Sequence, residues 1–348
     1  MAIDDTAKLF GLTKEQLDVL FSLEYALTLH DIESDLKHSD LKKQWLTEWF
    51  DILQKTQEIC LVPEDSIKST ILEVKDNSLS HTWLYMVILE TTLFHPYYPL
   101  GGEQDKLYRK LKFTKQNEYI KGLCRETGIV PEEYVERFQK TYSNAYKKIS
   151  GNTAKVVAAI MSVVAAAAIA AATAGIAAGP IAIALFGANF AGLHGAALVA
   201  ACLAMAGGGA IAVGGAGMAG GVAAIVGGGA ILGAAAGGAA VAAGHMIAKN
   251  MPSFTLSQAA KMEVVMKEIL LNAQQDTQAA QLVLEKLKER IHDLQRELDD
   301  LKLEQSNNRD QISNLKKSLA YLKKAYLEMN KFKSCYDTGT AAAQNEAI

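Results

Sequence analysis

The chain has 348 residues, of which 50% are hydrophobic, and it carries a net charge of −3 and four cysteines. This length allows two or three domains, and the near-neutral charge without a long basic run argues against a nucleic-acid partner. The cysteines lie far apart and form no CxxC pair, which argues against both a zinc site and a disulfide framework.

The composition changes sharply along the chain and predicts an all-α protein of four parts. We expect an all-α globular domain over 1–150, apolar membrane-interacting helical hairpins over 151–250, a coiled-coil helix over 251–335 and a disordered tail over 336–348. The acidic start, "MAIDDTAKLFG", has no basic region followed by an apolar one, so we expect synthesis in the cytoplasm without a signal peptide.

The first part has the hydrophobic spacing of a helical bundle. Apolar residues recur every three or four positions over 12–31 and 41–61, which predicts amphipathic helices. The more apolar stretch 80–94 predicts a buried central helix, and "HPYYPLGG" after it predicts a loop. Pro131 suits the first turn of a further helix over 131–149.

Residues 156–248 contain no Asp, Glu, Lys or Arg. Uncharged apolar runs of about 18 or more residues are typical of transmembrane helices, and this segment is several times that length. Breaks near 179–180, 189–194 and 207–209 allow about four spans, and two longer spans are the alternative. Basic residues on both flanks predict that both ends lie on the cytoplasmic side, which requires an even number of crossings.

Small side chains dominate this segment, and only about a third of it is Ile, Val, Leu, Met or Phe. Each span therefore buries little apolar area in lipid, but small residues at every fourth position let helices approach closely. The predicted packing positions are Gly217, Gly221, Gly229, Gly233 and Gly237. Such hairpins could stay in a bilayer, or fold against the rest of the protein and enter lipid when released. Ordinary core helices of a large domain are a third interpretation.

The region after the uncharged segment has seven heptads in unbroken register. Alternating four- and three-residue spacing predicts a coiled coil that drives oligomerisation. The predicted contact residues are Leu284, Leu287, Ile291, Leu294, Leu298, Leu301, Ile312, Leu315, Leu319 and Leu322. The preserved register favours one long helix, and a hairpin turning at "QSNNRD" is the alternative.

The order of a helical region, a central apolar region and a long heptad helix resembles the α-helical pore-forming toxins of the cytolysin A and tripartite haemolysin kind. The resemblance lies in the architecture and implies a membrane-inserting, pore-forming function with a lipid bilayer, and further copies or related helical proteins, as partners. A constitutive membrane scaffold or tether with a coiled-coil partner surface is the alternative. A weaker resemblance links "HDIESDLKHSD" to the acidic loop of tellurite-resistance-B-like helical domains.

No motif of the sequence points to enzymatic chemistry. The glycine-rich middle lacks GK[ST], and no GxSxG, HExxH or Cys–His constellation is present. "HDIESDLKHSD" contains enough carboxylates and imidazoles for a divalent metal, but a solvated helix junction is the commoner cause of such a cluster. His194, within the uncharged segment, is expected at a hairpin tip that water reaches, and His245 near an edge. We expect no enzymatic activity, cofactor or metal.

Overall fold

The computed structural model of the protein describes two stretches of the chain with a few short gaps, and we confine structural statements to them. The described residues are 14–57, 59–78, 81–98, 100, 103–114, 117–151, 252–303 and 309–339. These residues form helices and turns without any strand, which confirms the all-α fold class. The uncharged segment 156–248, with its predicted hairpins, lies outside the described residues.

Seven α-helices and one short 3-10 helix make up the described part of residues 14–151. They are α2 (Lys14–Ser34), α3 (Ser39–Gln57), η1 (Glu64–Ser66), α4 (Ile67–Asp76), α5 (Thr82–Leu93), α6 (Asp105–Tyr108), α7 (Asn117–Thr127) and α8 (Glu133–Ser150). The spacing of apolar residues predicted α2, α3, α5 and α8, whereas the shorter α4, α6 and α7 were not recognised. As expected, α5 is central, and every residue from Met86 to Leu93 is buried.

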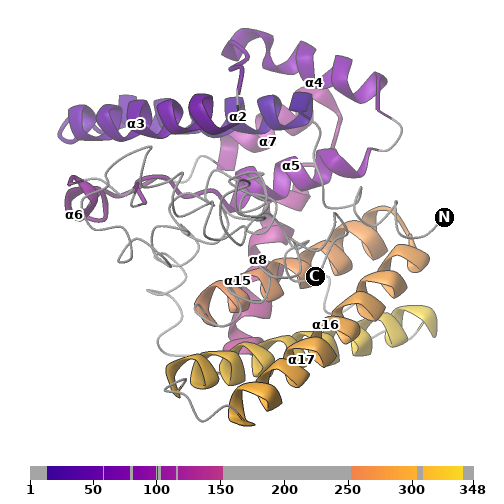
Figure 1. The fold of residues 1–348 in the computed structure, drawn as a ribbon. Helices are drawn as coiled ribbons and strands as arrows, with labels where there is room; N and C mark the ends of the chain where they lie inside the picture. The colour runs from indigo at the N-terminus through magenta and orange to yellow at the C-terminus, as the bar shows by residue number, and fades with distance from the viewer. Residues whose placement is uncertain are drawn as a thin grey trace, which may run out of the picture.

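The second described stretch forms four helical elements. They are α15 (Pro252–Val264), the π-helix η4 (Val265–Ala273), α16 (Thr277–Leu303) and α17 (Arg309–Asp337). Figure 1 shows α2, α3 and α4 at one side of the molecule, α16 and α17 at the other, and α5, α8 and α15 between them. Buried residues from both stretches form one continuous hydrophobic core. The predicted domain boundaries near residues 150 and 250 remain predictions. The helices before residue 150 and after residue 252 pack together in this shared core.

Helix α15 occupies the middle of this arrangement. It contacts α8 on one side and α17 on the other, and η4 continues it toward α16. The side chains from Thr255 to Leu271 are all buried, including several charged ones. A helix that is buried on every side cannot be amphipathic, so its sequence carries no clear hydrophobic stripe.

The heptad region folds as two helices that pack on each other, not as one long coiled-coil helix. Lys323 Nζ on α17 donates a hydrogen bond to Gln295 Oε1 on α16 at 2.9 Å. Tyr336, near the end of α17, donates from its hydroxyl to Leu271 O, shortly before α16 begins, at 3.0 Å. The two helices are therefore antiparallel, as in the hairpin alternative. Folding back buries both apolar stripes within one chain, without the entropic cost of bringing a second chain to it.

The predicted oligomerisation residues face the interior of this hairpin and the core beneath it. Ile291 and Ile312 are half-buried and the other eight are buried: Leu284, Leu287, Leu294, Leu298, Leu301, Leu315, Leu319 and Leu322. Their role in assembly stays a prediction, but in this conformation they are occupied within the chain.

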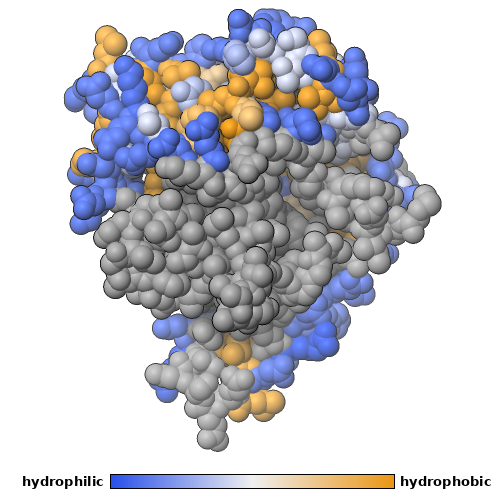
Figure 2. Space-filling view, turned by 45° about the horizontal axis from the view of Figure 1, so that its top comes forward, coloured by the Kyte–Doolittle hydropathy of each residue, from blue (hydrophilic) through white to orange (hydrophobic). Residues whose placement is uncertain are grey.

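The surface mixes polar and apolar residues. Figure 2 shows hydrophobic residues between hydrophilic ones in the upper part of that view. Among the residues that the structure describes, the exposed large hydrophobic side chains are Leu36, Leu72, Leu107, Leu303 and Leu327. Across the described ranges, no helix combines the length and hydropathy that crossing a membrane requires.

We expect a Leu319→Ala variant to lower the free energy of unfolding by about 2–5 kcal/mol, because Leu319 is 3% exposed and its truncation leaves a cavity. Urea denaturation followed by circular dichroism measures this loss. The matched control is Leu303→Ala, at 81% exposure, which should change stability by less than about 0.5 kcal/mol. A midpoint that rises with protein concentration would contradict an intramolecular hairpin, because it would show packing between chains.

Candidate functional site

The helices on either side of residues 152–251, α8 and α15, contact the same short part of α17. Lys324 Nζ donates a hydrogen bond to Ile149 O in the last turn of α8, at 3.1 Å. Near the start of α15, Thr255 and Ser318 are joined by a hydrogen bond between their hydroxyls, at 3.2 Å. Ser318 and Lys324 are six residues apart on one helix, which spans roughly 9 Å. The chain therefore leaves the described helices and returns to them at one place, which we call the junction.

Helix α8 ends cleanly at this junction. Gly151 has a φ of 69° and its N–H bonds to Lys147 O, which is a left-handed helix cap. A side chain at this position would meet Lys324 Nζ, because an added Cβ would lie 3.1 Å from that atom. Glycine here allows both the turn and the close approach of α17.

Buried polar contacts hold α8 against α15 and η4. Arg137 donates from Nη2 and Nε to Glu268 Oε2, at 2.6 and 3.0 Å, and Thr141 donates to Glu268 Oε1 at 2.7 Å. Further along, the Tyr142 and Ser257 hydroxyls lie 2.7 Å apart. Because the carboxylate of Glu268 is 2% exposed, losing its arginine would leave a charge without compensation in the core.

The element that follows α15 is a π-helix of nine residues, Val265–Ala273. Such helices are rare, occur mostly as single turns and are frequent at functional sites. Within it, the buried Lys267 donates to Glu263 Oε1 at 2.6 Å and lies 4.9 Å from the centre of the Phe332 ring. The element ends near Gln275, which has a φ of 54°. The buried helix thus ends in a rare π-helical geometry, and the ion pair between Lys267 and Glu263 stabilises this end.

Three charged side chains from distant parts of the sequence meet in the core, and we call them the buried triad: Glu24 of α2, Glu90 of α5 and Lys261 of α15. Lys261 Nζ donates to Glu90 Oε2 at 2.7 Å. The side chains are 2%, 2% and 3% exposed, in that order. Glu24 Oε2 and Glu90 Oε1 are buried without a hydrogen-bond partner. Lys261 therefore pairs with Glu90, and the second carboxylate, Glu24, lies close enough in the same low-dielectric environment to be influenced by both charges.

The surroundings of the buried triad favour its neutral forms. Burial raises the pKa of Glu24 well above its usual value, and the nearby charge of Glu90 raises it further, against the opposing effect of Lys261. Burial likewise raises the pKa of Glu90 and lowers that of Lys261. A neutral Glu24 beside a Glu90–Lys261 ion pair would leave no net charge in the triad. This triad connects α2 and α5 to α15, and Lys261 lies six residues after Thr255 of the junction.

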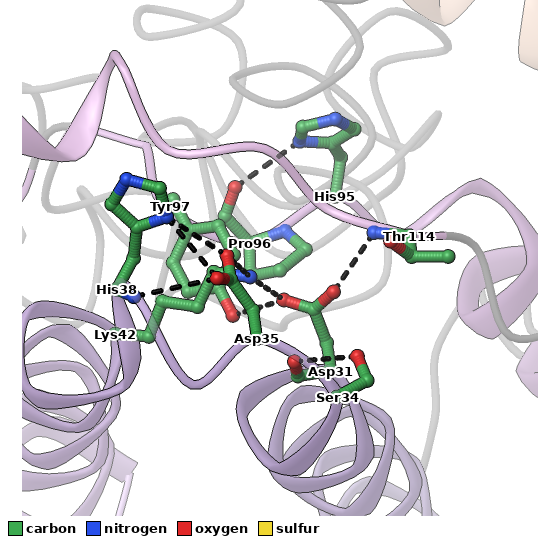
Figure 3. Close-up of polar contacts among 9 residues, drawn as sticks. All are labelled: Asp31, Ser34, Asp35, His38, Lys42, His95, Pro96, Tyr97 and Thr114. Atoms are coloured by element: carbon green, nitrogen blue, oxygen red, sulfur yellow. Dashed lines mark hydrogen bonds and ion pairs between the residues drawn. The ribbon is translucent and has the colours of Figure 1, made fainter.

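The acidic stretch that could have held a metal is neutralised by a lysine (Figure 3). Lys42 Nζ lies 2.6 Å from Asp31 Oδ2 and 3.0 Å from Asp35 Oδ2, in the place where a cation would bridge the two carboxylates. Asp31 also accepts hydrogen bonds from the Tyr97 hydroxyl at 2.5 Å and Thr114 N at 2.9 Å. Within the described residues, no group of three or more His, Cys, Asp or Glu could hold a metal ion.

Only Asp31 of this stretch is buried, in an ion pair with Lys42, whereas the other candidate ligands are partly or fully exposed, as a solvated helix junction predicts: His30, Glu33, Asp35, His38 and Asp40. Asp31 and Lys42 are 0% and 1% exposed, because the loop after α5 covers them. The hydrogen bond from Lys42 lowers the pKa of Asp35 to about 2, and His38 adds to this effect. Tyr97, which reaches Asp31 through its hydroxyl, has a φ of 68°. The ion pair therefore stabilises a strained loop conformation.

The structure brings together charged residues that the sequence analysis did not single out. The buried triad combines three helices, and no spacing along the chain reveals it. A signal was nevertheless present: Glu90 stands alone in "MVILETTLF", and "AAKMEVVMKEILL" places charges throughout an apolar stretch. The predicted packing positions Gly217, Gly221, Gly229, Gly233 and Gly237, together with His194 and His245, lie outside the described residues.

Comparison of the chain with models of known protein families, with curated proteins and with solved structures finds no match.

We expect a Glu24→Gln variant to be more stable than the unmodified protein above the usual pKa of glutamate, by about 1–3 kcal/mol. A carboxyl whose pKa is raised on folding stabilises the fold below its unfolded-state pKa, and this contribution is lost as pH rises through the folded-state pKa. Glutamine keeps the neutral form at every pH, so the variant should lose this part of the pH dependence. Urea denaturation at a series of pH values measures it.

The matched control for this prediction is Glu33→Gln, because Glu33 is exposed on the same helix. Its stability should follow the unmodified protein at each pH. Equal pH profiles for the Glu24→Gln variant and the unmodified protein would show that Glu24 does not bind a proton more tightly in the fold.

We expect a Lys42→Met variant to lose about 3–5 kcal/mol of unfolding free energy, because Asp31 would remain buried without its ammonium partner. Adding Asp31→Asn should restore part of this loss, since the buried charge is then removed. Lys43→Met, at the neighbouring exposed position, is the control and should change stability little. Equal effects of the Lys42 and Lys43 variants would contradict the role assigned to the ion pair.

Proposed function

We propose that the protein inserts its uncharged segment, 156–248, into a lipid bilayer and holds the two ends of that segment at the junction. The observation that supports this best concerns the helices that flank the segment: α8 and α15 reach α17 at positions six residues apart. A segment that starts and finishes at one point can cross a membrane only an even number of times. The basic flanks of the segment favour the same even number.

The composition of the segment suits reversible insertion. Burial in lipid stabilises a helix by about 25 cal/mol per Å² of apolar area, and Ala and Gly offer little of it. The spans would therefore depend on packing against each other through small residues. A segment with such modest lipid affinity can exchange between a form folded with the protein and a form in the bilayer, since the two differ by few kcal/mol.

We propose more specifically that several copies of the protein assemble in the bilayer and form a pore. It is supported by the arrangement of a helical domain, an apolar segment and a heptad region, and by the resemblance of that arrangement to α-helical pore-forming toxins. In the described conformation the heptad leucines are occupied within one chain. Assembly through them would therefore require the α16–α17 hairpin to open, while assembly through the membrane spans would not.

A constitutive membrane scaffold is the second candidate, and one observation favours it. An ion pair and hydrogen bonds hold α8 against α15 and η4, so that the described helices can stay folded while the segment is in the bilayer. Extraction with alkaline carbonate separates the candidates. A pore-forming protein before triggering should be released with soluble proteins, whereas a permanent scaffold should remain with the membrane.

We expect a Gly233→Leu variant to lose the ability to release a dye from liposomes, because a large side chain prevents close helix approach at a small-residue face. The control is Ala235→Leu, which adds the same bulk on the opposite side of the predicted helix. Circular dichroism should show unchanged helical content for both variants. Undiminished dye release by the Gly233→Leu variant would contradict the proposed packing, and no release by the unmodified protein would contradict pore formation.

A further inference from the structure

One side of α17 carries a row of exposed lysines. Lys317, Lys324 and Lys331 follow each other at intervals of seven residues, which is close to two helical turns, and Lys316 lies beside the first. We call these four residues the lysine face. Leu327 lies between the second and third of them and is 63% exposed, although it is a large hydrophobic side chain.

The charge of the lysine face is largely uncompensated. Helix α17 has three acidic residues: Glu328 pairs with Lys148 of α8, Asp337 pairs with Lys333, and Asp310 lies in the first turn. Among the described residues, Lys316, Lys317 and Lys331 take part in no ion pair. The neighbouring Lys323 is different, because it points to Gln295 of α16. An unpaired row of this kind creates a positive potential over one side of the helix.

The lysine face lies directly at the junction. Lys324 donates to Ile149 O and approaches Gly151, the last described residue before the uncharged segment. Lys147 in the last turn of α8 adds to the basic character of the same place. The positive side of the described helices is thus the side from which the chain enters the segment that we place in the bilayer.

We propose that the lysine face and Leu327 form a docking surface for the headgroups of anionic phospholipids. This inference rests on the proposed function, since it turns the junction toward the bilayer. Lysines near a membrane surface attract acidic lipids, and an exposed leucine among them can enter the interfacial layer. A nucleic acid would match the lysines but would leave Leu327 and the neighbouring apolar segment unexplained, so a membrane is the favoured partner.

The test uses the full chain and two kinds of vesicle, made of phosphatidylcholine alone or with added phosphatidylserine. The variant is Lys316→Gln, Lys317→Gln and Lys331→Gln together, and it leaves Lys324 in place because that residue bonds to α8. We expect the unmodified chain to sediment with the acidic vesicles more than with the neutral ones. The triple variant should bind acidic vesicles about 100-fold less tightly, since each lysine contributes about a factor of five.

The matched control changes the same number of lysines in the N-terminal part of the chain, on α3, on α6 and in the turn after α6: Lys43→Gln, Lys106→Gln and Lys110→Gln. These positions are also exposed, so the net charge changes equally while the lysine face remains. A second variant, Leu327→Asn, should weaken binding to acidic vesicles without changing its dependence on salt. Equal losses in the lysine-face and control variants, or no loss in either, would overturn the proposal. The rival partner is tested with a single-stranded RNA probe. If the lysine-face variant lost binding to this RNA but still bound acidic vesicles like the unmodified chain, the proposal would be overturned as well.

Dye release separates this inference from the proposed function. If acidic vesicles bind through the lysine face but no dye is released, the docking surface stands and pore formation fails. If dye is released equally from both kinds of vesicle and the triple variant behaves like the unmodified chain, the docking surface is wrong and insertion stands.

Discussion

The burial of α15 among three other helices is the constraint on which the rest of the fold depends. Because this helix has no solvent-facing side, each of its charges requires a partner from another element or from its own next turn. Lys261 reaches Glu90 on α5, Glu268 of the adjoining π-helix reaches Arg137 on α8, and Lys267 reaches Glu263. The first two pairs place α5 and α8 beside this buried stretch, and they join residues more than a hundred positions apart into one core.

Local periodicity was sufficient to predict the longer helices and their buried faces. The spacing of Trp45 and Trp49 identified the inner side of α3, and the apolar stretch around Ile88 identified a central helix. Heptad spacing also located the apolar stripe of α16 and α17. It could not distinguish a single long helix from a hairpin, because folding back preserves the register of both arms.

The candidate site was beyond prediction from the sequence because it depends on contacts between distant segments. Glu24, Glu90 and Lys261 come from three helices, and each looks like an isolated charge in its own stretch. The acidic stretch around Asp31 was predicted to be a helix junction without a metal, but nothing in the sequence indicated that Lys42 of the next helix forms a buried ion pair with Asp31. Charged residues within otherwise apolar helices were the one local sign that a buried network exists.

The left-handed turn at Gly151 has a mechanical consequence. If α8 continued past Gly151 as one rigid helix, any tilt or rotation of its far end would be transmitted to the contacts that Arg137 and Tyr142 make in the core. The turn ends the helix, and Lys324 donates a hydrogen bond to the carbonyl of Ile149 in its last turn. A change of direction in the chain after α8 therefore requires a change only in the backbone dihedrals of Gly151, so the contacts of Arg137 and Tyr142 need not move with it.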